Sequence, residues 1–378
     1  MPVNVCIARC DDYSADSVAA AFDRVLEPLG GIDWAQPGMT VAIKTNLVSR
    51  MSPDTAAVTH PSLLAELTRR LTARGARVIV GDSPGGPYTA AWVHSVYNGT
   101  LMEAVVKAGG ELNQDFGAEE VRFPEGVKAR AFTYTSWLSR ADAIIDFAKL
   151  KTHGMAGMTC AVKNFFGTIP GTRKPEMHYM YPNTADFCSM LVDLALYNKP
   201  RLTLVDAVDC MEGNGPTQGT LRHMGALLAA DTPFNADLVC AHLIGMDAND
   251  APTVAESIRR GLCPADWREL EIDGDPDIFA LPDFEKLPIS SKIDFTNKLP
   301  VVGALLRRGF GTGPKIDRSK CVGCGKCAEV CPAGAAHVEH GKAAIDAKKC
   351  IRCFCCQEFC PKGAVSVHRP LLARLLSR

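Results

Sequence analysis

The feature that most constrains this chain is a run of cysteines that occurs twice near its end. Of 16 cysteines in 378 residues, nine lie between Cys321 and Cys360. Residues 321–332 and 350–361 both follow the pattern C-x2-C-x2-C-x3-C-P, and each copy leads into Gly-Ala and a short predicted strand. Disulfide-bonded secreted proteins distribute their cysteines through a small fold, whereas this chain concentrates them in one segment. The concentration therefore indicates metal binding in a reducing compartment.

The duplicated segment resembles a bacterial two-cluster ferredoxin, whose ligand runs have this spacing. The resemblance implies two [4Fe-4S] clusters, because the fourth cysteine of each run serves the other cluster. On that pattern one cluster takes Cys321, Cys324, Cys327 and Cys360, and the other takes Cys350, Cys353, Cys356 and Cys331. Cys355 is left over and is expected to be a small apolar filler. Structural zinc is the alternative, but zinc sites use two cysteine pairs separated by a long spacer.

The rest of the chain alternates predicted strands with predicted helices. We expect strands at 3–8, 39–43, 76–80, 141–149, 201–208 and 225–230, and helices at 14–29, 61–74, 184–197, 234–244 and 252–260. This alternation favours an α/β body with a mainly parallel sheet. The predicted domains are the body at 1–272, a connecting segment at 273–314, an α+β two-cluster ferredoxin-type domain at 315–370 and a tail at 371–378.

Charge and hydropathy exclude several classes of protein. Residues 1–314 hold 29 Lys+Arg against 37 Asp+Glu, whereas residues 315–378 hold 12 against 5. The acidic body disfavours nucleic-acid binding. The basic C-terminal segment is expected to hold the clusters and not to form a groove for nucleic acid. The uneven charge suits an acidic partner or docking between the two parts, although two solvated surfaces explain it equally well. Without an apolar run of about 18 residues or a signal peptide, we expect no membrane span and a cytoplasmic location.

Polar residues directly follow several of the predicted strands of the body. Ligands bind beyond the carboxyl ends of strands in open α/β sheets, so these residues could surround one cleft. The segment 149–178 is also rich in lysine and contains a glycine-bearing turn that opens a helix, which suits an anion. We therefore predict a ligand that bears carboxylate or phosphate; the alternative is that these lysines lie on a solvated loop. The candidate catalytic residues are His153, Lys163 and Lys151, and the candidate ligand-binding residues are Lys44, Asn46, Asp82, Asn164 and Asp206.

Two further features limit the kind of chemistry. The sequence contains neither a Walker loop nor a dinucleotide-binding fingerprint, so a nucleotide cofactor is not predicted from motifs. Cys160 lies inside the basic glycine turn and would be a nucleophile if its thiol pKa were lowered there. The more usual outcome for such a residue is a small, buried and unreactive cysteine.

Four segments of the body resemble the family named domain of unknown function 362. They are 43–48, 80–85, 150–153 and 161–171, and the Leu-Lys-Thr-His and Val-Lys-Asn motifs are the most specific parts. Thr45 stands where the family often has proline, which affects only the local turn. Many members are similar in carrying a C-terminal two-cluster ferredoxin domain. The resemblance implies iron–sulfur binding and a redox setting, but no defined substrate.

Together these observations predict a ferredoxin-type electron-transfer protein. We expect it to exchange electrons with a redox partner protein and to deliver them to a small anionic substrate in the body. The alternatives are an electron carrier or an assembly factor whose body binds a partner protein without catalysis. If the strand-end residues converge on one pocket beside the clusters, the hypothesis of an enzyme is favoured over these alternatives.

Overall fold

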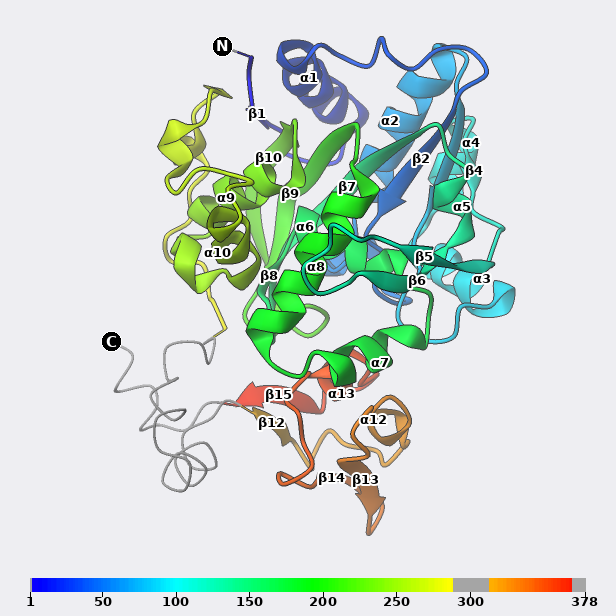
Figure 1. The fold of residues 1–378 in the computed structure, drawn as a ribbon, viewed down its shortest axis with the longest axis vertical. Coiled ribbons are helices and arrows are strands. Elements are labelled where there is room, and N and C mark those ends of the chain that lie inside the picture. Colours follow the sequence, from blue (N-terminus) through cyan, green and yellow to red (C-terminus); the bar gives the residue numbers. More distant parts are fainter. Residues whose placement is uncertain (1, 288–312, 369–378) are drawn as a thin grey trace.

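The computed structural model describes residues 2–287 and 313–368, and it consists of an α/β body and a small C-terminal module (Figure 1). Within those residues the body contains a nine-stranded sheet in the order β11-β1-β10-β9-β7-β2-β3-β4, with β8 paired to β7. Its strands are β1 (Val5–Arg9), β2 (Thr40–Thr45), β3 (Arg77–Gly81), β4 (Glu111–Leu112), β7 (Ala143–His153), β8 (Gly157–Thr159), β9 (Leu202–Glu212), β10 (Thr220–Ala230) and β11 (Ile272–Asp273).

The central part of the sheet is parallel, as predicted. Strands β4, β3, β2, β7 and β9 pair in parallel, so their carboxyl ends meet at one edge. Strand β10 runs antiparallel to both β1 and β9. The prediction of a mainly parallel α/β body is therefore confirmed, with β10 as an antiparallel insertion.

Helices cover both faces of the sheet. One face packs against α1 (Ala15–Leu26), α2 (Pro61–Ala73) and α3 (Ala90–Gly99), and the other against α6 (Ala161–Asn164), α8 (Thr184–Asn198), α9 (Pro233–Leu243) and α10 (Pro252–Arg259). The helices and strands predicted for residues 3–260 are all present, with ends that differ by a few residues, whereas a possible short helix expected near residues 301–308 lies outside the described residues. The sequence reasoning missed α3, α4 (Glu103–Lys107), α5 (Ser136–Ser139), α7 (Arg173–Met180) and the hairpin of β5 (Ala118–Arg122) and β6 (Ala131–Thr135).

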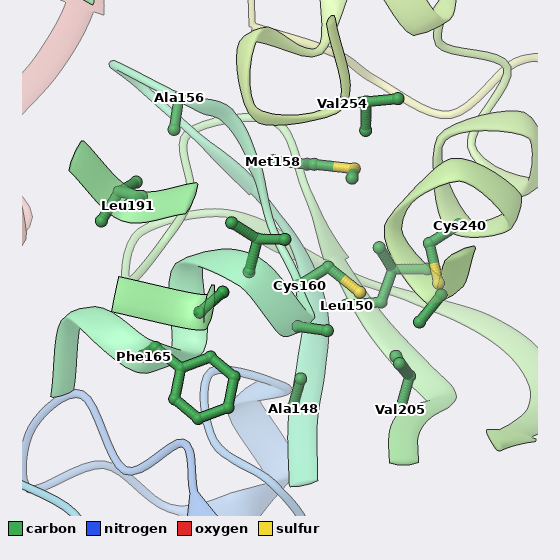
Figure 2. Packing of buried hydrophobic residues seen from close by; sticks show 14 of the residues in the cluster. Ala148, Leu150, Ala156, Met158, Cys160, Phe165, Leu191, Val205, Cys240 and Val254 are labelled. Atoms are coloured by element: carbon green, nitrogen blue, oxygen red, sulfur yellow. The ribbon is translucent and has the colours of Figure 1, made fainter. Parts of the chain in front are cut away.

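The alternation of side chains along β7 divides the core into two clusters. Ile145 and Phe147 point to the α1–α2 face, whereas Ala148 and Leu150 point to the α8–α9 face. Figure 2 shows the second cluster, in which Cys160 lies among apolar side chains near Cys240. Burial raises the pKa of Cys160, so this residue is a buried thiol rather than an activated nucleophile.

The C-terminal module repeats one unit twice, as its sequence does. Each cysteine run contains a short helix before its fourth cysteine, α12 (Lys326–Glu329) or α13 (Cys355–Glu358). Two antiparallel pairs complete the module: β12 (Gly313–Ile316) with β15 (Val365–His368), and β13 (Ala336–Glu339) with β14 (Lys342–Ile345). The α+β character predicted for this part of the chain is confirmed.

The body continues past residue 272, where we expected it to end. Strand β11 pairs with β1, and Glu285 donates its backbone N–H to Glu212 at 2.9 Å. We therefore infer that the body extends to at least residue 285. Most of the expected connecting segment (288–312) and the tail (371–378) lie outside the described residues. Among the helices that the structure describes, none has the length and apolar character needed to span a bilayer.

Candidate functional site

A pocket lies where the carboxyl ends of the parallel strands face the C-terminal module. It contains about 730 Å³ of space not filled by protein atoms, part of which is open to solvent. Body residues come from the ends of β2, β3 and β7 and from α6 and α7, and module residues come from the second cysteine run. We call it the interface pocket; its polar lining residues are Asn46, Ser49, Asp82, Ser83, Lys151, His153, Thr159, Lys163, Asn164, Lys174, His178, Cys355 and Glu358.

The module is held against the body by its second cysteine run. Gln357 donates its side-chain amide to the backbone oxygen of Asn214 at 2.8 Å, and Thr217 donates its hydroxyl to that of Glu358 at 3.2 Å. The ring of Phe359 sits against Gly85, where a Cβ atom would lie 2.5 Å from the ring. These contacts place α13 at the wall of the pocket, on the side of the module nearest the body (Figure 1).

An ion pair, which has no net charge, lies at the inner side of the pocket. Lys44 Nζ lies 2.8 Å from Asp82 Oδ1 and donates to Asn164 Oδ1 at 3.0 Å. Asn164 in turn donates to Asp146 Oδ1 at 2.7 Å, where burial raises the pKa of the carboxyl. Gly167 permits this packing, because a Cβ there would lie 2.1 Å from Asp82. Lys44 therefore orients Asn164 and adds little net charge to the pocket.

Three other lysines give the pocket its positive charge. Lys151 donates to Asn46 Oδ1 at 2.9 Å and to the Ala57 carbonyl, and Lys174 donates to the Ser83 carbonyl at 2.6 Å. Burial lowers the pKa of both lysines to about 7, and in the part of the chain that the structure describes no carboxylate lies within ion-pair distance of either. Among the described residues, Lys163 has no hydrogen-bond or ion-pair partner, and its Nζ lies over the face of Phe166, 5.4 Å from the ring centroid.

His153 connects the body directly to the module. Its Nε2 lies 2.7 Å from Glu358 Oε1, while its Nδ1 accepts the backbone N–H groups of Met155 and Ala156, each at 3.1 Å. Because Nδ1 accepts, the ring proton is on Nε2 and is donated to Glu358. Burial lowers the pKa of His153 to about 4, so the imidazole is neutral. Burial alone would raise the pKa of Glu358, but the His153 hydrogen bond and nearby positive charge lower it to about 2.

Two polar atoms in the pocket wall lack partners. In the part of the chain that the structure describes, His178 Nδ1 and Thr159 Oγ1 are buried and have no hydrogen bond. The His178 ring stacks on Phe187 at 4.3 Å, which fixes its orientation, and burial lowers its pKa to about 3. Unsatisfied buried polar atoms are rare in folded proteins, so these two are available to a ligand.

The cysteines of the module surround spaces of their own. Cys321, Cys324, Cys327 and Cys360 line one cavity together, as the ligand pattern predicts for the first cluster. Backbone N–H groups point at several sulfurs: Ala343 donates to Cys321 at 3.2 Å, Ala335 to Cys331 at 3.1 Å and Ala364 to Cys360 at 3.2 Å. Such bonds favour thiolates, so the donor set fits a [4Fe-4S] cluster. Cys355 instead lines the interface pocket.

The structure brings together most of the predicted site residues, but not all of them. Asn46, Asp82, Lys151, His153, Lys163 and Asn164 line the interface pocket, and Lys44 contacts two of them. Asp206 does not reach it; this carboxylate pairs with Lys149 at 2.8 Å and accepts the Tyr13 hydroxyl at 3.1 Å. Lys174, His178 and Glu358 also line the pocket, and of these only His178 was considered from the sequence, as a candidate acid. The basic composition of 149–178 signals the first two, whereas Glu358 resembles any helix-surface acid.

Comparisons with known proteins agree with these features. The family model of a domain of unknown function, DUF362, matches residues 41–242, and that of a 4Fe-4S dicluster domain matches residues 313–361. The second match confirms the predicted [4Fe-4S] clusters over zinc. A thylakoid-associated protein of Synechocystis sp. is 33% identical over 273 residues, which cover 70% of this chain and 81% of that relative.

Two solved structures show a more distant likeness. The lactate racemase apoprotein of Thermoanaerobacterium thermosaccharolyticum matches 63% of this chain and 56% of its own, with 11% identity and a TM-score of 0.39. A protein of Thermotoga maritima matches 57% and 56%, with 11% identity and a TM-score of 0.35. The chain thus spans a little over half the length of each of these structures.

Proposed function

The chain belongs to the DUF362 family and is an iron–sulfur protein, and from this premise we propose that it reduces a small anionic substrate in the interface pocket. One observation carries the proposal: the same pocket is lined by cationic residues of the body and by the second cysteine run of the module. A scaffold that only recognised another protein would not need an internal cationic space at this position. The proposed reaction class is a ferredoxin-type reduction.

The cluster ligands are assigned from the cavity and the ligand pattern together. Cys321, Cys324, Cys327 and Cys360 would hold one cluster, and Cys350, Cys353, Cys356 and Cys331 the other. When bound, the clusters supply single electrons to the pocket. The second cysteine run is the one packed on the body, so its side of the module faces the substrate.

The lysines select the charge of the substrate. Lys163 has no partner among the described residues, and Lys151 and Lys174 have only neutral ones, so an anion would be their first ionic partner. Buried charges need such a partner, because desolvation without one is costly. His178 and Thr159 offer additional polar atoms that would orient the anion.

The same residues account for proton delivery. Reduction adds negative charge to the substrate, and a proton from a neighbouring acid neutralises it. Lys151 is suited to this role, because burial brings its pKa to about 7. It would give its proton to the substrate and recover one from solvent. His153 is a positioning residue, since both ring nitrogens are engaged in fixing Glu358 and the turn after β7.

The proposal includes a redox partner protein and a cytoplasmic location. Clusters of this kind need an electron donor, and the free buried cysteines of the body suit a reducing compartment. Because one relative is named as thylakoid-associated, the alternative location is at a membrane. Cell fractionation distinguishes the two.

Reoxidation of the reduced protein tests the proposed reaction. The anaerobic holoprotein is reduced with dithionite, freed of excess reductant and mixed with a panel of carboxylates, phosphates and other small oxyanions. Saturable recovery of the visible absorbance with one class of anion is the expected result, with weaker saturation for Lys163→Met and no change for the exposed control Lys107→Met. If no anion reoxidises the protein while an electron-transfer protein does, the electron-carrier alternative replaces the enzyme.

A further inference from the structure

The two cysteine runs have the same sequence pattern but very different surroundings. In the second run, Cys353 is 8% exposed and Phe354 is buried against the core of the body. At the equivalent positions of the first run, Cys324 is exposed and Gly325 is partly exposed. The duplicated module is therefore asymmetric: one end is covered by the body, and the other end faces outward (Figure 1).

Polar contacts with the body follow the same division. The second run and the strand after it are joined to the body by hydrogen bonds of Glu358, Gln357, Cys360 and Val367. Within residues 2–287 and 313–368, we find no hydrogen bond or ion pair from residues 321–331 to the body. An approaching protein can thus reach the first run without displacing the body.

The outward end carries an apolar centre with positive charge around it. Val322 is 58% exposed and lines the first cysteine cavity together with Lys326 and Lys362. Arg318 and Lys320 are exposed directly before Cys321. Of these cations, Lys326 pairs with Glu329 at 2.7 Å, and no other described acid lies within ion-pair distance of the rest. We call these residues (Arg318, Lys320, Val322, Lys326 and Lys362) the first-run face.

We propose that the first-run face docks an acidic one-electron carrier protein, so that electrons enter the module there and leave through the second run toward the interface pocket. An apolar centre with a charged rim is the usual composition of a transient protein interface. The positive rim attracts an acidic carrier and accelerates its encounter with the chain. The step is a one-electron transfer: the carrier is oxidised, the module is reduced, and no covalent bond changes. The inference rests on the proposed function and adds the partner and its entry side.

Charge reversal at the first-run face tests the inference. Flavodoxin hydroquinone serves as the acidic donor, and reduction of the anaerobic holoprotein is followed by stopped-flow absorbance. Lys320→Glu/Lys362→Glu should slow the second-order rate by about tenfold or more at low salt and abolish most of its salt dependence. The matched control Lys348→Glu/Lys349→Glu reverses two exposed lysines next to the second run and should leave the rate within about twofold of the native chain.

Three further readouts separate docking from cluster function. Dithionite should reduce both variants like the native chain; a failure here would contradict the iron–sulfur reduction itself rather than the docking face. Carbodiimide cross-linking should join flavodoxin to Lys320 or Lys362. Basic cytochrome c should oxidise the charge-reversed variant faster than the native protein. Equal slowing by the control, unchanged flavodoxin rates, or a face that binds nucleic acid or anionic vesicles but not flavodoxin would each overturn the inference.

Discussion

Substitution of Gly85 by alanine tests whether the module must stay docked for the interface pocket to exist. A Cβ at residue 85 would lie 2.5 Å from Cζ of Phe359 and 3.2 Å from the Val48 carbonyl oxygen. Gly85 cannot easily retreat, because its N–H donates to that oxygen at 2.8 Å and its own carbonyl accepts from Trp92 at 2.7 Å. The ring of Phe359 must therefore leave its position.

The size of the effect follows from this overlap. Carbon atoms in contact prefer about 3.5–4.0 Å, so the substitution shortens this contact by roughly 1 Å. Overpacking of this kind costs about 1–3 kcal/mol. If the whole cost falls on the docked state, the ratio of docked to undocked module decreases about five- to 150-fold.

Hydrogen exchange measures this ratio at the interface. The Val367 amide donates to Asn214 Oδ1 at 3.2 Å and is exposed when the module undocks. We expect its exchange in Gly85→Ala to be faster by a similar factor, with iron and sulfide content unchanged. Gly313→Ala is the matched control, because a Cβ there meets no atom within 4 Å.

A second substitution separates steric conflict from general damage. In the double variant Gly85→Ala/Phe359→Leu, the shorter side chain makes room for the new methyl group, and exchange should return toward the native rate. If the Val367 amide of Gly85→Ala exchanged at the rate of the native chain, the reasoning would be refuted, because the Phe359 ring would then have room that the structure does not show. Faster exchange without recovery in the double variant would also contradict it.

Three further predictions concern the clusters and the lysines. Cys356→Ser should lose about half of the bound iron and Cys355→Ser almost none, as iron and sulfide analysis would show; equal losses would contradict the ligand assignment. Lys163→Met should weaken binding of phosphate or succinate about tenfold or more by calorimetry, and unchanged affinity would remove Lys163 from the site. The pKa of Lys151 is about 7 when folded and 10.5 ordinarily, so the unfolded chain holds more protons between these values and native stability rises with pH there. Lys151→Met should remove about 1.4 kcal/mol per pH unit from that rise in anaerobic guanidinium unfolding at pH 7 to 9, whereas an unaltered slope would show that folding does not lower the pKa of Lys151.

The periodic parts of the fold could be predicted from the sequence. The leucines of α2 recur at helical spacing, and the apolar residues 41–43 at the centre of β2 are typical of a buried strand. The missed elements lack these signals. Helix α3 has a weaker apolar periodicity than α2 and no side-chain hydrogen bond from its N-cap residue, and α5 is only one turn long. The strand β5 is mostly exposed, so its side chains carry little apolar pattern.

The candidate site could be predicted only as far as local rules reach. Residues beyond the paired ends of parallel strands share a sheet edge. Asn46 and Asp82 follow β2 and β3, and Lys151 lies on the part of β7 that extends past its pairing with β2, so the three converge. Asp206 failed to join them because it lies inside β9 and not after it, where its register partner Lys149 neutralises it. Glu358 could not be found, since its role depends on how the module docks more than 200 residues from His153.

The buried lysines link ligand binding to proton uptake. Lys151 and Lys174 lie in a low-dielectric space and, within the described residues, neither forms an ion pair with a carboxylate; their pKa of about 7 leaves each only partly charged near neutral pH. A bound anion would favour the charged form and raise both pKa values. Binding near pH 7.5 should therefore take up protons, and the affinity should fall as the pH rises above 7, because fewer ammonium groups remain. Calorimetry of phosphate binding in two buffers of different ionisation enthalpy measures this uptake. Binding without proton uptake would mean that the two lysines stay charged in the empty pocket. The free energy of folding would then include the full cost of desolvating both ammonium groups, which their neutral hydrogen-bond partners cannot offset.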